Sequence, residues 1–283
     1  MECALYVVAT PIGNLRDITL RALDVLTSAD TVAAEDTRNT RHLLQHYGIG
    51  DTRLLALHQH NERNGAERII ELLQQGLTVA LVTDAGTPAV SDPGAVLVEA
   101  VLAAGLRVIP VPGASAAVAA LSCSGLAMPH FLFYGFLPNK SAARRSSLQA
   151  LTEHPYTLVF YEAPHRIVES VADLQAVFGD EREIVLAREI TKLFESIHRC
   201  KLGVAMEWLN SEANNQRGEF VILIEGAKAR PDGLSSEAEK TLGLLLEELP
   251  LKQAVQLAVK ITGENKNELY QHALELKART TDE

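Results

Sequence analysis

The sequence has few cysteines, few aromatic residues and no long apolar run. Three cysteines among 283 residues, widely spaced and without a CxxC pair, exclude a disulfide framework and a thiolate zinc site. Aromatic residues make up 5% of the chain, so stacking on aromatic rings is not expected to dominate ligand recognition. Apolar runs such as residues 78–82 are too short to span a bilayer, and the N-terminus does not resemble a signal peptide. We therefore expect a cytoplasmic protein without a membrane partner.

Three common nucleotide-binding and hydrolase motifs are also missing. The nearest start of a GxGxxG fingerprint, Gly48-Ile49-Gly50, follows a predicted helix and continues with Arg53 where glycine is needed. The sequence contains neither a GKS or GKT P-loop nor a GxSxG elbow. The sequence therefore lacks the motifs that usually indicate a dehydrogenase, an ATPase or a serine hydrolase.

The charge balance is acidic, with a net charge of -10, and this argues against indiscriminate coating of nucleic acid. Lys140, Arg144 and Arg145 form the clearest basic patch, with no acidic residue between Asn139 and Ala150. A solvated helix face is the usual explanation of such a run, but in an acidic chain it is also the natural contact for phosphate. We expect these three residues to bind RNA.

The first half of the chain repeats a short apolar run, a polar turn and an amphipathic helical stretch. Five such runs are present, at residues 5–9, 31–34, 54–57, 78–82 and 108–111. A β-strand followed each time by a helix predicts a mostly parallel sheet covered by helices. The chain is long enough for two domains and a small addition.

Beyond residues 122–129 the pattern changes, and we take that stretch as the start of a second lobe. Its candidate strands, at residues 131–136, 157–161, 183–187, 195–199 and 220–225, predict hairpins and a mixed sheet. A linker at residues 227–233 precedes three short helices at residues 242–249, 251–261 and 265–276, which resemble a helix-turn-helix in outline. We predict an α/β fold with domains at residues 1–126, 127–228 and 229–283, the last a helical tail.

Polar loops follow all five predicted strands of the first lobe. They are residues 10–14, 35–38, 58–62, 83–88 and 112–115. Ligands of parallel sheets bind where such strand-end loops converge. Their glycines and prolines give the loops defined shapes, so we predict a rigid ligand cradle, although each loop alone is more often only a turn or cap.

Other charged residues leave alternatives open. His42 with His46, and His58 with His60, could each lie on one face, but a third ligand is missing and we expect no metal. After strands of the second lobe, an internal ion pair such as Arg166 with Glu189 is as plausible as a functional role.

With these segments in place, the chain resembles the ribosomal small-subunit methyltransferase I family, whose members are class III, tetrapyrrole-methylase-like enzymes. The motifs that carry the resemblance are TPIGNLRDIT at Thr10, AAEDTRNTRHLL at Ala33, LHQHNE at Leu57, DAGTPAVSDPG at Asp84, PGASAAVAALSCSGL at Pro112, GFLPNK at Gly135, FYEAPHR at Phe160, AREITK at Ala187 and RGEFVILIEG at Arg217. The terminal segment from Pro250 is similar to the helical tail of that family, and Thr83 stands where serine is expected.

The resemblance implies S-adenosylmethionine as methyl donor, bound between two α/β lobes, and the 2′-hydroxyl of a cytidine in the decoding region of 16S rRNA (the family target is cytidine 1402) as acceptor. It also implies a homodimer. Carried onto this chain, the cofactor contacts would be Pro11, Gly13, Asp84, Ala85, Gly86, Thr87, Pro88, Val90, Ser115, Ala116, Tyr161, Phe220 and Val221. The few aromatic residues favour weak binding to naked RNA and use of the assembled small subunit.

A ribose hydroxyl is a poor nucleophile, so a base or a cation near it would help methyl transfer. The candidate bases and cations after the strands are Glu35, Asp36, His58, His60, Glu162 and His165, with Arg38, Arg166 and Lys192. Glu162 and His165 are preferred because they follow a strand of the lobe that forms the cleft. Two alternatives stay open: a C-methyltransferase of tetrapyrrole precursors, and a non-catalytic RNA- or ribosome-binding module.

Overall fold

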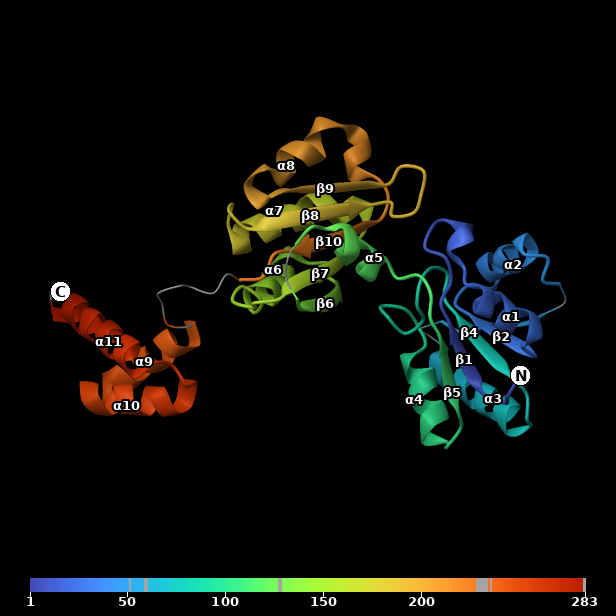
Figure 1. Ribbon diagram of the computed structural model, residues 1–283, viewed down its shortest axis with the longest axis horizontal. Coiled ribbons are helices and arrows are strands. Elements are labelled where there is room, and N and C mark those ends of the chain that lie inside the picture. The colour runs from blue at the N-terminus through green and yellow to red at the C-terminus, as the bar shows by residue number, and fades with distance from the viewer. Residues whose placement is uncertain (51, 59–60, 127–128, 228–233, 235, 282–283) are drawn as a thin grey trace. The chain divides into compact units, whose positions relative to one another are not determined.

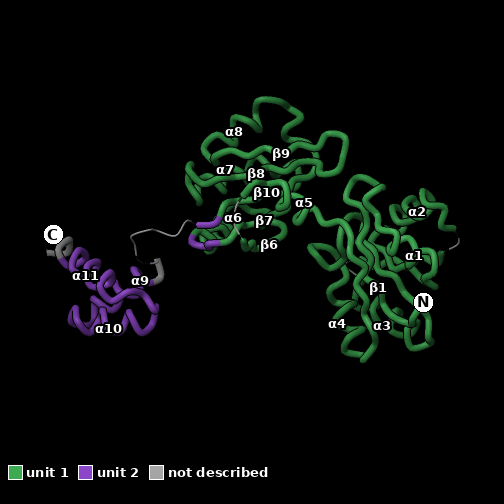
Figure 2. Tube along the Cα trace, in the orientation of Figure 1, with its two compact units in different colours: residues 1–152, 156–225 green, residues 153–155, 226–283 purple. Residues whose placement is uncertain are grey.

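The computed structural model describes residues 1–50, 52–58, 61–126, 129–227, 234 and 236–281. Its contacts divide the chain into two compact units, residues 1–152 with 156–225, and residues 153–155 with 226–283 (Figure 2). Both sheets belong to the first unit, so the boundary at residue 126 stays a prediction. Residues 127–128 of the expected lobe boundary, and residues 228–233 of the expected linker, lie outside the described residues.

The first sheet is wholly parallel, with strand order β3-β2-β4-β1-β5. Its strands are β1 (Leu5–Val8), β2 (Thr31–Ala34), β3 (Arg53–Ala56), β4 (Val79–Val82) and β5 (Val108–Val111). One apolar cluster joins one face of the sheet to helices α1 (Leu20–Ser28) and α2 (Thr37–His46). Another joins the opposite face to α3 (Glu62–Gln74) and α4 (Ala95–Ala103) (Figure 1). Because both faces are covered, the central strands are continuous apolar runs, and the predicted parallel sheet is confirmed.

The second sheet is mixed, with strand order β6-β7-β10-β8-β9. Its strands are β6 (Phe131–Phe136), β7 (Thr157–Glu162), β8 (Glu183–Arg188), β9 (Ser196–Lys201) and β10 (Phe220–Ile224). Only the β6–β7 pair is parallel, and β8 with β9 forms the predicted antiparallel hairpin. The remaining elements of this region are α5 (Ala116–Cys123), α6 (Ser141–Gln149), α7 (Ile167–Phe178), α8 (Leu202–Ser211) and the short 3₁₀ turns η2 (Pro164–Arg166) and η3 (Ala213–Gln216). A further 3₁₀ turn, η1 (Leu15–Asp17), lies between β1 and α1.

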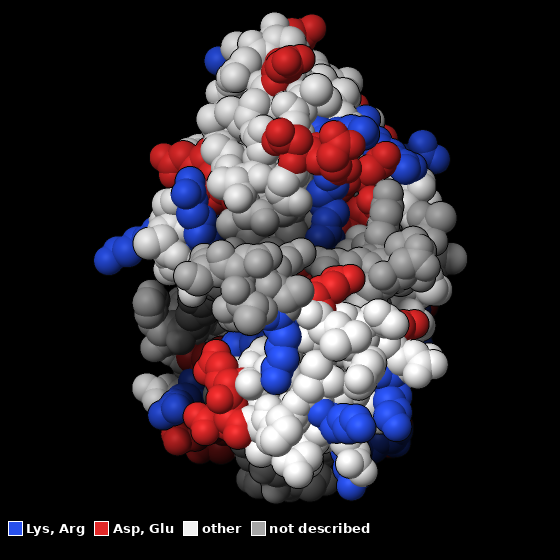
Figure 3. Space-filling view, turned by 90° about the vertical axis from the view of Figure 1, so that its left-hand side faces the viewer, with Lys and Arg blue, Asp and Glu red and all other residues white. Residues whose placement is uncertain are grey.

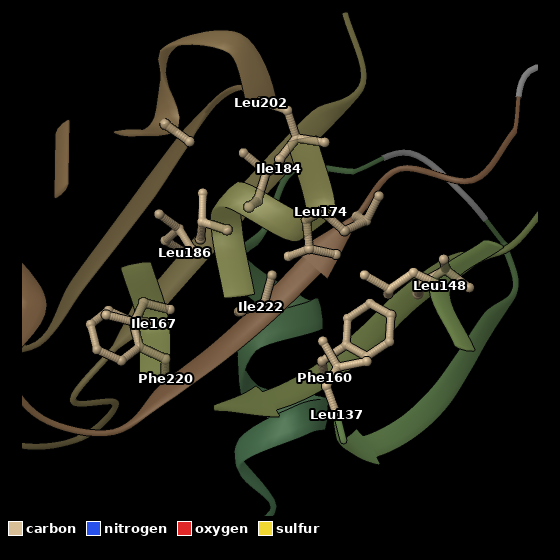
Figure 4. Close-up of a cluster of buried hydrophobic side chains, with 14 of the residues drawn as sticks. Leu137, Leu148, Phe160, Ile167, Leu174, Ile184, Leu186, Leu202, Phe220 and Ile222 are labelled. Carbon is tan, nitrogen blue, oxygen red and sulfur yellow. The ribbon is translucent and has the colours of Figure 1, made fainter. Parts of the chain in front are cut away.

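Apolar side chains cover both faces of this second sheet. On one face, side chains of α6, α7 and α8 pack on strand residues such as Phe160, Ile184, Leu186 and Ile222 (Figure 4). On the other face, Ala117 and Ala120 of α5 pack on strand residues of β7, β8 and β10. Helix α5 comes after β5 of the first sheet in the chain, and it packs on the second sheet. It therefore holds the loop between β5 and α5 against the second sheet. This placement matters for the site because that loop contains Ser115.

The described residues of the second unit form three helices, α9 (Ser236–Glu248), α10 (Leu251–Thr262) and α11 (Lys266–Thr281). They share a small apolar core that includes Leu242, Val255, Ala258 and Leu269, and Gly263 ends α10 in the left-handed conformation. The predicted trio of helices is confirmed, with α9 beginning earlier than expected. Within the described part of the chain, no helix combines the length and apolar character needed to cross a membrane.

Candidate active site

The loops after β1 and β4 are joined by backbone hydrogen bonds. The Thr10 N–H donates to the Gly86 carbonyl at 2.8 Å, and the Gly86 N–H donates back to the Thr10 carbonyl at 3.1 Å. Gly86 has φ of 90°, a conformation that favours glycine. The Thr10 hydroxyl, which is buried, donates to the Thr83 carbonyl at 3.1 Å. Backbone hydrogen bonds therefore hold together two of the strand-end loops whose convergence the sequence predicts.

A cavity of about 400 Å³ opens above these loops. Its described lining comes from the ends of β1, β2 and β4, the start of α5, and the second sheet. The lining residues are Ile12, Glu35, Thr83, Asp84, Ala85, Gly86, Thr87, Val90, Asp92, Ser115, Ala116, Phe136, Tyr161, Glu162, Ala163, Pro164, Ile190, Glu219, Phe220 and Val221. We call it the first cavity. Its volume lies within the range of small-molecule and cofactor sites, roughly 300–1,000 Å³.

The first cavity is strongly acidic. Among the described residues that line it there are five carboxylates and no lysine, arginine or histidine. Glu162 pairs with Arg166, and Glu219 pairs with Lys192. The other three, Glu35, Asp84 and Asp92, form no salt bridge within the described part of the chain. A cavity with this charge favours a cationic ligand.

The pKa of Asp92 reflects this acidic environment. Burial raises the pKa of its carboxyl from 3.8 to about 6, and the neighbouring carboxylates of Glu35 and Asp84 add to the rise. The Thr83 side chain partly offsets this rise in pKa, and its hydroxyl donates to Glu35 Oε2 at 2.6 Å. Three carboxylates therefore share one small volume, and a positive charge placed there would relieve their repulsion.

Asp84 is held in a fixed orientation on this wall. Its Oδ2 accepts from the Asn39 side-chain amide at 2.8 Å, and its Oδ1 accepts from the Asp36 N–H at 3.2 Å. The Asp36 side chain caps α2, since its Oδ1 accepts from the Arg38 N–H at 2.8 Å, and it pairs with the Arg38 guanidinium at 2.6 Å. Hydrogen bonding from Arg38 lowers the pKa of Asp36 to about 2. Asp36 therefore supports the loop and stays ionised.

Tyr161 and Glu162 enter the first cavity from the end of β7. The Tyr161 hydroxyl accepts from the Ala117 N–H at 3.3 Å, and burial raises the pKa of that hydroxyl. Glu162 is 2% exposed, and both its oxygens are occupied: Oε1 by the Ala163 N–H and Oε2 by the Ser170 hydroxyl. Arg166 lies 3.3 Å from Oε1 and donates to the Leu137 carbonyl at 2.7 Å. The geometry gives Glu162 a supporting position beneath the cavity.

A second cavity of about 370 Å³ adjoins the first. It shares Ile12, Thr83, Asp84, Ala85 and Glu219 with the first cavity. Its remaining lining residues are Pro11, Gly13, Leu15, Asn39, Thr40, His42, Leu43 and Lys192. The two cavities therefore meet at a common wall, and Asp84 faces both.

Lys192 reaches the second cavity from the β8–β9 loop. Its Nζ donates to Glu189 at 2.9 Å and to Glu219 at 2.8 Å. Burial alone lowers the pKa of Lys192, but these hydrogen bonds outweigh burial and hold it above its ordinary value. Gly13 permits the approach of this loop, because a Cβ there would lie 2.4 Å from Lys192 Cγ and 2.8 Å from Thr191 Oγ1. Internal ion pairs were one of the two alternatives left open for these residues, and they form with other partners than Arg166 with Glu189: Arg166 pairs with Glu162, and Glu189 pairs with Lys192.

The structure brings most of the predicted cofactor residues together. Ten of the thirteen line the first cavity: Asp84, Ala85, Gly86, Thr87, Val90, Ser115, Ala116, Tyr161, Phe220 and Val221. Pro11 and Gly13 line the second cavity, and Pro88 is buried beside the first without lining either. Among the predicted bases and cations, Glu35 and Glu162 line the first cavity and Lys192 the second. His165 and His58 are exposed and line neither, and His60 lies outside the described residues.

The expected basic patch is corrected by the structure. Arg144 is fully buried, where its Nε donates to Asp173 at 2.7 Å, so its guanidinium does not face an RNA. Arg145 pairs with the same carboxylate, so Lys140 is the exposed cation of the three that forms no ion pair with another described residue. Described lysines and arginines lie interspersed with acidic side chains on the face that Figure 3 presents. Arg144 can be buried because it pairs with Asp173, since a charged side chain is tolerated in a core when an opposite charge lies beside it.

Sequence reasoning did not name eight of the lining residues of the first cavity as site residues: Ile12, Thr83, Asp92, Phe136, Ala163, Pro164, Ile190 and Glu219. Thr83 directly precedes the DAGTPAVSDPG motif and Asp92 lies within it. Extending the predicted site over that whole segment would have included both residues. Phe136 and Glu219 belong to strand ends of the second sheet, where the strand order, not the spacing, places them at the cavity. No group of three or more histidine, cysteine or acidic side chains among the described residues is arranged to hold a metal ion.

Comparisons with known proteins give consistent results. Residues 4–205 match the family of Tetrapyrrole (Corrin/Porphyrin) Methylases, and residues 232–277 match the RsmI C-terminal HTH domain. The chain is 54% identical to ribosomal RNA small subunit methyltransferase I of Pseudomonas aeruginosa, over 98% of each chain. It is 51% identical to the protein of the same name from Escherichia coli O157:H7, over 96% of this chain and 94% of that one.

Solved structures show the same fold at low identity. The methyltransferase CobJ aligns with a TM-score of 0.59 and 20% identity, over 81% of this chain and 97% of its own. Uroporphyrin-III C-methyl transferase from Thermus thermophilus, complexed with S-adenyl homocysteine, aligns with a TM-score of 0.54 and 18% identity, over 78% of this chain and 97% of its own. These two likenesses establish the architecture of the chain.

Proposed function

The chain belongs to the ribosomal RNA small subunit methyltransferase I family, a family of methyltransferases, and from this premise we propose its reaction in detail. The enzyme transfers the methyl group of S-adenosylmethionine to the 2′-hydroxyl of a cytidine ribose in the decoding region of 16S rRNA, the family target being cytidine 1402. The observation that carries the donor assignment is the acidic first cavity, whose three unpaired carboxylates favour a cation.

The residues present fit this donor. S-adenosylmethionine supplies, when bound, a methyl group on a positively charged sulfur, and this sulfonium gives the molecule a net positive charge because its ammonium and carboxylate groups cancel. Glu35, Asp84 and Asp92 provide the complementary negative field, whereas Phe220, Val221 and their apolar neighbours provide a surface for the adenine ring. The Ser115 loop and the bridged loops after β1 and β4 hold the cradle in shape.

The proton of the acceptor hydroxyl needs a base, and the wall common to both cavities carries two carboxylates, Asp84 and Glu219. Glu219 pairs with Lys192, so Asp84 is the better candidate for the base. Asn39 and the Asp36 N–H fix its orientation, and its oxygens retain lone pairs that can accept from a hydroxyl. With the donor bound, its sulfonium would supply the methyl group, and Asp84 would accept the proton that leaves the ribose hydroxyl. Glu162 supports the loop after β7 instead, because its oxygens are already engaged.

Three further features belong to the proposal. The substrate is the assembled small subunit, because the chain is acidic overall and poor in aromatic residues that could stack on bases. The enzyme acts in the cytoplasm, where that substrate is made. It acts as a homodimer, which rests on the family resemblance and is tested by light scattering of the purified protein.

Transfer of labelled methyl to small subunits from a strain lacking this enzyme tests the proposal, with mapping of the labelled nucleotide. We expect one 2′-O-methylated cytidine in the 16S rRNA, and at least about tenfold less label on naked 16S rRNA. Asp84→Asn should reduce kcat by roughly 100-fold or more while the fold persists, and should weaken donor binding by only about fivefold through the loss of one negative charge. Label in uroporphyrinogen and none in the subunit would establish the tetrapyrrole alternative in its place.

A further inference from the structure

Aromatic rings gather at the first cavity, although aromatic residues make up only 5% of the chain. Phe136 and Tyr161 both line this cavity, and their ring centroids lie 5.6 Å apart with an interplanar angle of 66°. Phe133 also packs on Tyr161, with 5.0 Å between the centroids. Tyr161 is partly buried, whereas Phe136 is 52% exposed. A large part of the Phe136 ring is therefore accessible to a ligand in the cavity.

A β-bulge in β6 turns Phe136 toward the cavity. Side chains of a regular strand alternate between its two faces, so residues 133 and 136 would lie on opposite faces. In β6, however, the register with β7 shifts between Phe133 and Gly135, and both phenylalanines contact Tyr161. Gly135 has φ of 81°, a conformation that favours glycine. Bulges of this kind re-aim side chains next to active sites, and here the re-aimed side chain is Phe136.

The loop that follows Phe136 is fixed by Arg166. One terminal nitrogen of Arg166 donates to the Leu137 carbonyl at 2.7 Å and to the Pro138 carbonyl at 3.1 Å. The other donates to Asn139 Oδ1 at 2.5 Å. The bulge before Phe136 and the arginine after it therefore hold the ring in place before a ligand binds.

The exposed ring faces the same volume as the unpaired carboxylates of the first cavity. A Cβ on Gly135 would lie 2.8 Å from Ser91 Oγ, so the bulge contacts the segment that carries Asp92. Burial raises the pKa of the Tyr161 hydroxyl, and the charge of Asp92 adds to that rise. The face of an aromatic ring attracts a cation through its quadrupole, and the carboxylates attract the same cation through their charge.

We propose that Phe136 is a specificity-determining residue whose ring binds the sulfonium of the donor through a cation–π contact. This inference rests on the proposed function and deepens its donor site. S-adenosylhomocysteine, which remains after methyl transfer, has a neutral sulfur and loses this contact. Phe136 therefore favours binding of the charged donor over retention of the neutral product.

Two substitutions at Phe136 test the assignment in the full-length enzyme. Phe136→Leu keeps an apolar side chain and removes the aromatic ring, whereas Phe136→Tyr keeps the ring. Phe131→Leu is the matched control, because it makes the same change at the other end of β6, at a residue that is 50% exposed and lines neither cavity. The readouts are the dissociation constants of S-adenosylmethionine and S-adenosylhomocysteine by calorimetry.

We expect Phe136→Leu to weaken the binding of S-adenosylmethionine about fivefold, with the affinity for S-adenosylhomocysteine within about twofold of the wild type. Phe136→Tyr should keep the wild-type ratio of the two affinities, because its ring offers the same π face. Phe131→Leu should match the wild type for both compounds.

Two results would overturn the assignment and leave the proposed function standing. Equal weakening of both compounds in Phe136→Leu would show that the ring contacts a part of the molecule that both share. Wild-type affinities for both compounds would show that Phe136 has no role in donor recognition. The proposed function fails on a different measurement: a wild-type enzyme that binds the donor and transfers no methyl group to small subunits.

Discussion

Replacement of Asp92 by asparagine should stabilise the free enzyme at neutral and alkaline pH. The carboxyl of Asp92 has its pKa raised from 3.8 to about 6, by burial first and then by Glu35 and Asp84. A group whose pKa is higher in the folded state favours folding when protonated, and that advantage is lost as the pH rises through the folded value. Above pH 6 the ionised Asp92 therefore destabilises the fold, and the neutral amide of asparagine removes this effect.

The size of the effect follows from the shift of about two pKa units, at about 1.4 kcal/mol each, which sets an upper limit near 3 kcal/mol. Asp92 is only partly buried, so solvent screening reduces the expected gain to about 1–2 kcal/mol at pH 8. The gain should shrink between pH 6 and pH 4 and be close to zero below about pH 4. Urea unfolding of the variant and the wild type across this range measures it.

The same substitution should weaken the donor site. Removing one negative charge lowers the affinity for a cationic ligand, so the preference for S-adenosylmethionine over neutral S-adenosylhomocysteine should fall by roughly fivefold. Asp17→Asn provides a control, since that carboxylate is exposed and lines neither cavity. A variant equal to the wild type in stability at pH 8, or a gain that grows toward low pH, would refute the reasoning about Asp92.

Other substitutions test the supports of the site. Glu62 accepts the N–H groups of Gly94, Val96 and Leu97 at the start of α4, so Glu62→Ala should cost about 2 kcal/mol in urea unfolding. Asp173→Ala leaves the buried Arg144 guanidinium without its closest partner and should cost about 3–5 kcal/mol in the same assay. Gly13→Ala places a methyl against the β8–β9 loop and should lower kcat/KM for the subunit by at least about tenfold.

Each of these substitutions has a control on the same molecule. Glu62→Gln keeps an acceptor oxygen and should recover about half of the lost stability. Glu169→Ala removes an exposed partner of Arg144 and should cost less than about 1 kcal/mol, so an equal cost to Asp173→Ala would contradict the burial argument. Gly50→Ala adds a methyl with no atom within 4 Å and should leave kcat/KM unchanged.

The strands were predictable because their apolar runs are short, uninterrupted and followed by turns. All five strands of the first sheet fall within a residue of the predicted runs, since a strand covered on both faces has no polar alternation to obscure it. The convergence of the loops also followed, because parallel strands end at one edge. Strand order and the pairing of β10 with both β7 and β8 depend on long-range packing that spacing does not encode.

The charged groups were harder to place, because the environment of a charge depends on segments distant in sequence. Arg144 looked solvent-exposed in a basic run, but its partner Asp173 lies on the next helix, α7. Asp92 looked like part of a turn, but the neighbours that raise its pKa come from the ends of other strands. The sequence shows which residues are charged, but the electrostatic environment of each charged group depends on the fold.

The paired backbone hydrogen bonds between Thr10 and Gly86 have a consequence for the speed of binding. These hydrogen bonds form when the protein folds, so the two loops are already ordered before a ligand binds. Binding therefore loses no conformational entropy by ordering them. Donor association should therefore resemble docking onto a rigid body, with single-exponential kinetics whose rate rises linearly with donor concentration. Any slow conformational step in the catalytic cycle would then belong to capture of the RNA.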